Sequence, residues 1–117
     1  MNACRLNALR QDAGGMRAAR SRASEKVGLR VRDLRDKQTI SRVKLAERAD
    51  MDVSHLARIE NGTENPTLFL LIQLATALDV SLTSLVQGLK AEDLPENIKP
   101  YSEADFRREL RRHADSA

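Results

Sequence analysis

Aromatic residues, cysteine and long apolar runs are scarce in this chain of 117 residues, and each scarcity excludes a class of protein. Only Phe69, Tyr101 and Phe106 are aromatic, so the core is expected to be aliphatic, which favours helices over a β-sandwich. The single cysteine, Cys4, excludes an internal disulfide framework and a cysteine-rich zinc site, and it fits a reducing cytoplasm. No apolar run approaches the roughly 18 residues of a membrane-spanning helix, and the N-terminus lacks the apolar stretch of a signal peptide.

Signatures of catalysis are missing as well. The sequence contains no glycine-rich phosphate loop and no Ser-His-Asp grouping. His55 has no second histidine nearby to share a metal, because His113 lies close to the C-terminus. We therefore expect no enzyme, no metal site and no cofactor.

The length corresponds to one domain, and the charge is distributed unevenly along it. The net charge is +3, but residues 1–48 contain 13 Lys and Arg against 5 Asp and Glu, a net charge of +8. Residues 49–117 contain 7 basic and 12 acidic residues, a net charge of −5. This asymmetry favours a polyanionic partner such as nucleic acid.

Helical periodicity divides the chain into an arm, a domain and a tail. Residues 1–25 form a basic arm with Gly14-Gly15 inside it, interpreted either as a solvated disordered tail or as a contact to a nucleic-acid backbone. Residues 26–88 form the domain, residues 89–101 a linker with two prolines, and residues 102–117 a helical tail. No segment shows the alternation of a strand, so the predicted class is all-α.

Apolar spacing and capping residues predict the helix boundaries. Val27, Val31 and Leu34 predict a first helix over 24–37. A third helix over about 53–61 ends where Gly62 can take the left-handed conformation, and a fifth ends at Gly88. The tail is expected to form a helix over 103–114. Residues that cap the second to fifth helices are Ser41, Asp52, Thr67 and Ser81.

The segment 41–60 contains two short helices joined by a tight break near Asp50-Met51. Ala46 is small at the point where the two helices must cross closely. The residues able to pack that crossing are Leu45, Ala49, Leu56 and Ile59. This pattern indicates a helix-turn-helix motif, whose second helix enters a major groove of DNA.

Six sequence blocks extend this motif across residues 26–88. They are VGLRVRDLR at 27–35, ISRVKLAE at 40–47, LARIENG at 56–62, NPTL at 65–68, LATALDVS at 74–81 and SLV at 84–86. Together they resemble the XRE-type helix-turn-helix domain shared with Cro and the lambdoid phage repressors. The resemblance covers 63 of 117 residues. It implies a five-helix lambda-repressor-like domain that binds double-stranded DNA, usually as a two-fold dimer.

The resemblance also implies roles for single residues. Val53, Ser54 and Arg58 match positions that read bases, and Arg58 is the candidate for a bidentate contact to guanine. Arg42 matches a position that either reaches a phosphate or braces the third helix. Positions that contact the DNA backbone are those of Arg42, His55, Asn61, Thr63, Asn65 and Thr67.

Two acidic residues depart from the family pattern. Asp50 replaces the usual glycine of the turn, and Asp tolerates a left-handed conformation at some cost. Asp52 replaces the usual Ser or Thr cap, which places another acid near phosphates and is expected to weaken non-specific affinity. Because Val53 and Ser54 are short, sequence preference is expected to depend on Arg58 and on DNA shape.

The segment LFLLIQL at 68–74 is apolar on nearly every side. It has two interpretations: a locally enlarged core covered by the tail or the arm, or a surface for self-association or a partner. Dimers of the resembled family also pair near the fifth helix. The candidate dimer or partner residues are therefore Phe69, Leu70, Leu82, Leu85, Val86 and Leu89.

These observations predict a sequence-specific DNA-binding transcriptional regulator of bacterial or phage type, acting in the cytoplasm without contact to a membrane. A dimeric repressor or autoregulator would place helix 53–61 in the major groove of a pseudo-palindromic operator. An antitoxin or a restriction–modification controller remains open within this class. The alternative from another class is a protein-interaction module on the same scaffold, with weakened DNA readout and a partner bound through the apolar fourth helix and helix 103–114.

Overall fold

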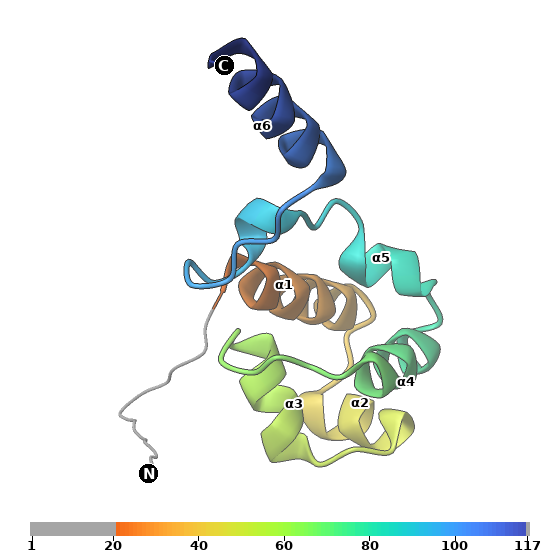
Figure 1. Ribbon diagram of the computed structural model, residues 1–117. Helices are drawn as coiled ribbons and strands as arrows, with labels where there is room; N and C mark the ends of the chain where they lie inside the picture. Colours follow the sequence, from red (N-terminus) through yellow and green to blue (C-terminus); the bar gives the residue numbers. More distant parts are fainter. Residues whose placement is uncertain (1–20, 117) are drawn as a thin grey trace, which may run out of the picture.

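The computed structural model describes residues 21–116, and this part of the chain contains helices and no strand. The helices are α1 (Arg22–Lys37), α2 (Arg42–Ala49), α3 (Val53–Glu60), α4 (Leu68–Leu78), α5 (Leu82–Val86), the 3-10 turn η1 (Ala91–Asp93) and α6 (Glu103–Ser116). Helices α1 to α5 pack together, and α6 extends away from them (Figure 1). The predicted all-α class, with five helices and a short C-terminal one, is confirmed.

Side-chain caps fix the starts of the helices, as predicted. Ser41 accepts a hydrogen bond from the Lys44 amide at 3.0 Å, and Thr67 accepts one from the Leu70 amide at 3.2 Å. Ser81 occupies the cap position of α5 but makes no such bond. Helix α1 begins at Arg22 rather than at the predicted residue 24, because Ser21 caps it. Residues 22–25, assigned to the arm, therefore lie in α1, and residues 1–20 of the arm lie outside the described part.

A residue in the left-handed conformation follows each of the helices α1 to α5, beginning with Thr39 after α1, with φ of 54°. Asp50 and Asp79 follow α2 and α4 with φ of 57° and 58°, and Gly62 follows α3 with φ of 77°. The predicted left-handed conformation is therefore confirmed at Asp50 and at Gly62. Helix α5 ends at Val86, two residues before the predicted Gly88. Gly88 lies just beyond it, also with φ of 77°.

The core is aliphatic and receives side chains from all five helices of the domain. Its buried hydrophobic residues are Val27, Val31, Leu45, Ala46, Ala49, Leu56, Ile59, Leu74, Ala75, Leu78 and Leu85. Gly28 lets α1 approach the end of α3, because a Cβ atom at this position would lie 2.3 Å from the Ile59 carbonyl oxygen and 2.8 Å from that of Glu60. Helices α1 and α3 are therefore in direct backbone contact, a feature that periodicity alone does not indicate.

Residues 89–101 were predicted to form a linker, but the first part of this segment contains the 3-10 turn η1 and is bonded to the domain. The buried carboxylate of Asp93 accepts hydrogen bonds from Lys26 Nζ at 2.8 Å and from the Lys90 amide at 3.0 Å. The hydrogen bond from Lys26 is the main reason that the pKa of Asp93 lies below its ordinary value. Residues 89–93 are thereby held against α1.

Helix α6 is stabilised within itself. Ser102 and Asp105 cap its N-terminus reciprocally, and Arg107 pairs with Glu103 one turn away. It extends to Ser116, beyond the predicted residue 114, and none of its residues is buried. Phe106 and Leu110 of α6 are 48% and 53% exposed, so these two side chains are not packed on the domain.

Candidate nucleic-acid interface

Helices α2 and α3 form the helix-turn-helix, and the turn between them is held from two sides. The Met51 amide donates to the Ala46 carbonyl at 3.0 Å, which closes the end of α2. The Gln73 side chain of α4 donates to the carbonyls of Ala49 at 2.8 Å and Asp50 at 3.2 Å. The orientation of α3 relative to α2 is therefore fixed by α4 as well as by the core.

Helix α3 presents the predicted base-reading residues on its outer side. Leu56 and Ile59 are buried in the core, whereas Val53, Ser54 and Arg58 are exposed. The Asp52 carboxylate accepts hydrogen bonds from the Ser54 amide at 3.1 Å and the His55 amide at 3.3 Å, so it caps α3. These bonds use two of the amides that lack partners at a helix start, so α3 is structured from its first turn.

Glu60, at the end of α3, is the centre of a buried ion-pair cluster. Its side chain is completely buried, and Oε2 accepts a hydrogen bond from Arg35 Nε of α1 at 2.7 Å. Oε1 accepts hydrogen bonds from Arg35 Nη2 at 3.1 Å and from Arg42 Nε of α2 at 2.8 Å. The cluster joins α1, α2 and α3, and it holds the C-terminal end of α3 in place.

Two opposing effects act on the pKa of Glu60. Burial raises the pKa, but the hydrogen bonds from Arg35 and Arg42, together with their positive charges, lower it by more. The pKa of Glu60 therefore lies below its ordinary value and the residue is ionised at neutral pH. The hydrogen bonding between Arg35 and Glu60 raises the pKa of Arg35.

Of the two roles that the sequence left open for Arg42, the structure shows a brace, made to Glu60 at the end of α3. The Arg42 side chain remains 37% exposed, so part of the guanidinium still faces solvent. The role of Glu60 was not predicted. The position of Glu60 relative to Leu56 and Ile59 does place an acidic residue on the apolar side of α3, and this pattern could have identified Glu60 as a buried ion-pair residue.

A second cluster lies on the outer side of α3. Glu64, in the loop after α3, has Oε1 2.8 Å from His55 Nε2 and Oε2 3.4 Å from Arg58 Nε. All three side chains are partly exposed. Glu64 was not predicted, because it lies in a loop where spacing carries no information about which helix it faces.

The remaining predicted backbone-contact residues surround the same loop. Asn61 and Asn65 are exposed, and the Thr63 hydroxyl donates to the Arg58 carbonyl at 3.2 Å, which ends α3. Thr67 caps α4. These residues thus lie in or next to the connection between α3 and α4, and the hydroxyls of Thr63 and Thr67 are already used for local structure.

Comparisons with known proteins agree with this geometry. A family model described as helix-turn-helix matches residues 31–85. The crystal structure of the restriction–modification controller protein C.AhdI from Aeromonas hydrophila is 35% identical, with a TM-score of 0.52 over 53% of this chain and 94% of the controller. The chain belongs to the XRE-type helix-turn-helix family.

Two further members of the helix-turn-helix family are similar to this chain. The structure of SinR, a master regulator for biofilm formation, in complex with DNA is 32% identical, with a TM-score of 0.51 over 52% of this chain and 98% of SinR. The immunity repressor protein of Bacillus phage phi105 is 37% identical over 60 residues, which is 51% of this chain. The chain spans 42% of the length of that repressor.

The predicted partner surface of this helix-turn-helix domain is exposed on α4 rather than on α5. Leu68, Phe69 and Ile72, here named the α4 patch, are 59%, 76% and 45% exposed. Within residues 21–116, neither α6 nor any other segment covers Phe69, and the arm, which the sequence also offered as a cover, lies outside the described residues. Leu70, Val86 and Leu89 are half-buried against the core, and Leu82 is half-buried as well. Leu85 is completely buried, so its assignment to a partner surface was wrong.

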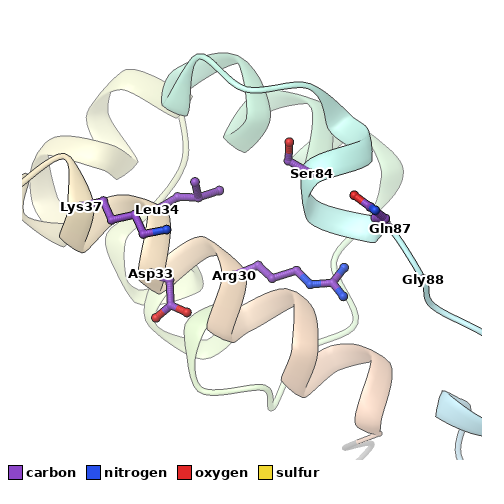
Figure 2. Close-up of a pocket in the computed structure, with 7 residues that line it drawn as sticks. All are labelled: Arg30, Asp33, Leu34, Lys37, Ser84, Gln87 and Gly88. Atoms are coloured by element: carbon purple, nitrogen blue, oxygen red, sulfur yellow. The ribbon is translucent and has the colours of Figure 1, made fainter.

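The exposed side of α5 is polar. Ser84 and Gln87 line a shallow hollow of about 460 Å³ between α5 and α1, opposite Arg30 and Lys37 (Figure 2). Arg30 crosses this hollow and donates to the Leu85 carbonyl at 3.0 Å. Among residues 21–116, no helix is long and apolar enough to cross a membrane, and no group of three or more potential metal ligands occurs.

Proposed function

We propose that this protein is a sequence-specific, DNA-binding transcriptional regulator that places α3 in the major groove. The observation that carries this proposal is the two-sided character of α3. Its inner side is fixed by core residues and by the Glu60 cluster, while its outer side presents Val53, Ser54 and Arg58. A helix held rigidly on one side and exposed on the other is the geometry required for reading base edges.

Base reading is assigned mainly to Arg58. Its side chain is 52% exposed, and a guanidinium can donate two parallel hydrogen bonds to O6 and N7 of guanine. Val53 would contact a thymine methyl group, and Ser54 can donate or accept at a base edge. Because these two side chains are short, most of the discrimination is expected from Arg58 and from DNA shape.

Contacts to the DNA backbone are proposed for the residues around α3. The Arg42 guanidinium, whose side chain is 37% exposed, and the partly exposed His55 ring each suit a phosphate. The polar loop side chains that complete the set are Asn61, Thr63, Asn65 and Thr67. Such contacts set the register of the protein on the duplex and carry no sequence information themselves.

The active form is proposed to be a homodimer that pairs through the α4 patch. Three large apolar side chains exposed on consecutive turns of one helix are unfavourable in water unless another surface covers them. A two-fold dimer would present two copies of α3 to successive major grooves. The likeness to a phage immunity repressor supports a repressor or autoregulator, acting in the bacterial cytoplasm where its DNA target lies. No catalytic role is proposed.

Selection from a random pool of duplex DNA tests this function. The full chain is expected to enrich a pseudo-palindrome whose half-sites lie about 10–10.5 base pairs apart. Absence of enrichment at low salt would contradict the proposal and favour a protein-interaction module on the same scaffold.

Arg58→Ala then tests the base-reading role on the selected operator. We expect a loss of about 1–3 kcal/mol at the operator and a smaller loss on random DNA. Arg107→Ala is the matched control, since it removes an exposed arginine from α6 and leaves α3 unchanged. Equal losses on both DNAs would show that Arg58 contacts phosphate only.

A further inference from the structure

We propose that Glu64 is a specificity-determining residue of the DNA interface, which makes Arg58 available to guanine while withholding its charge from phosphates. This inference rests on the proposed function. Its basis is the position of one carboxylate between two residues of the outer side of α3. Glu64 lies 2.8 Å from His55 Nε2 and 3.4 Å from Arg58 Nε.

The point of contact on Arg58 determines what the guanidinium can still do. Glu64 meets Arg58 at Nε, the nitrogen nearest the backbone. The terminal amino groups Nη1 and Nη2 lie beyond this contact, and they form a pair that matches O6 and N7 of guanine. The carboxylate therefore limits the rotation of the Arg58 side chain and leaves a base-reading edge available.

The charge of Glu64 acts differently on specific and non-specific binding. Attraction to phosphates depends on the number of free cations at the interface, because each one releases a counterion from DNA. A carboxylate beside Arg58 cancels that cation, so random DNA loses attraction. Guanine O6 and N7 are uncharged acceptors, so a hydrogen bond to them depends less on the net charge of the pair. Glu64 is thus expected to lower random affinity more than operator affinity.

The position of Glu64 in the loop makes this pairing possible. Its side chain is 33% exposed, so solvent reaches the carboxylate. The Thr63 hydroxyl, which donates to the Arg58 carbonyl at 3.2 Å, holds the loop next to the last turn of α3. Glu64 is therefore held beside His55 and Arg58 of the proposed recognition helix.

Glu64→Gln is the variant that separates charge from shape, since glutamine keeps the size and the hydrogen-bonding capacity of the side chain. Fluorescence anisotropy would measure its affinity for the selected operator and for a random duplex between about 50 and 200 mM salt. Over this range, the affinity of a protein that contacts phosphates changes strongly with salt. On the random duplex we expect affinity about eightfold higher near 0.1 M salt and a salt slope steeper by about 0.9, corresponding to one more neutralised phosphate. Operator affinity is expected to rise by less, so the preference for the operator falls.

Glu92→Gln is the matched control. It changes the net charge by the same amount, but it lies in η1, outside the helix-turn-helix of α2 and α3. Its effect on both duplexes is expected to be less than that of Glu64→Gln. A second readout needs no DNA: the chemical shift of the Arg58 Nε–H resonance in NMR spectra is expected to change in Glu64→Gln and to stay unchanged in Glu92→Gln, because Glu64 forms an ion pair with Arg58.

The outcomes separate this inference from the function on which it rests. A wild-type chain that binds no duplex overturns the proposed function and this inference together. A wild-type chain that prefers its operator, with a preference that Glu64→Gln leaves unchanged, overturns the role of Glu64 alone. An equal gain for Glu64→Gln and Glu92→Gln on random DNA also overturns it, because net charge then explains the effect.

Discussion

Replacing Glu60 by Gln removes the carboxylate that Arg35 and Arg42 share, and it tests how the recognition helix is held. The side chain is completely buried, and it accepts three hydrogen bonds of 2.7, 3.1 and 2.8 Å from the two arginines. A glutamine at this position retains one acceptor oxygen, but its amino group faces a guanidinium that also only donates. The positive charges of Arg35 and Arg42 then remain beside a neutral amide, and a third cation, Arg32, has its Nε 3.9 Å from the same Oε1 of Glu60 in the wild type.

The expected cost follows from the exposure of each arginine. Arg35 is 13% exposed, so water can replace little of the lost counter-charge, whereas Arg42 is 37% exposed and regains more hydration. Removing one partner of a buried ion pair costs about 3–5 kcal/mol, and the partial hydration of Arg42 places this case near the lower end. A loss of about 3 kcal/mol is large for a domain whose total stability is expected to be about 5–15 kcal/mol.

Urea denaturation followed by circular dichroism at 222 nm measures this loss. Arg42→Gln is the graded comparison, since it removes one hydrogen bond to a charged group and leaves the Arg35 pair intact. It is expected to cost about 1.5 kcal/mol. A cost for Glu60→Gln below about 1 kcal/mol, or one smaller than that of Arg42→Gln, would refute the assignment of a buried, strongly coupled cluster.

Three further predictions concern other parts of the molecule. The pKa of Glu60 is lowered from its ordinary value of 4.5, so the ionised side chain contributes to stability above pH 4.5 and this contribution is lost as the pH falls through the lowered pKa. The urea denaturation curves of the wild type and of Glu60→Gln should therefore converge below pH 4.5. Gly28→Ala would push α1 away from the end of α3, and the free energy of unfolding should fall by about 1–3 kcal/mol in the same urea assay. Phe69→Glu should convert a dimer to a monomer in light scattering without loss of helical signal, and an unchanged mass would exclude Phe69 from the dimer surface.

Local residues made much of the fold predictable. The caps at Ser41, Asp52 and Thr67 act within three residues of their own position, so their hydrogen bonds can be expected from the sequence. Asp50 takes the left-handed conformation because the turn requires it there. The periodicity of leucine and alanine then identified the core sides of α2, α3 and α4.

The features that were missed depend on contacts between distant residues. Lys26 and Asp93 are 67 positions apart, and no spacing rule connects them. The burial of Leu85 was also missed, because α5 has only five residues and so brief a pattern does not show which side other helices cover. The pairing of Glu64 with Arg58 required the path of the loop after α3 to be known.

The measurement that tests the central claim most directly is the ratio of two dissociation constants, for the selected operator and for a scrambled duplex of the same length, at physiological salt. A regulator that reads bases through α3 is expected to prefer the operator by about 10³-fold or more. That preference should decrease in Arg58→Ala and persist in Arg107→Ala. A ratio near one, with strong salt dependence on both duplexes, would contradict sequence-specific recognition.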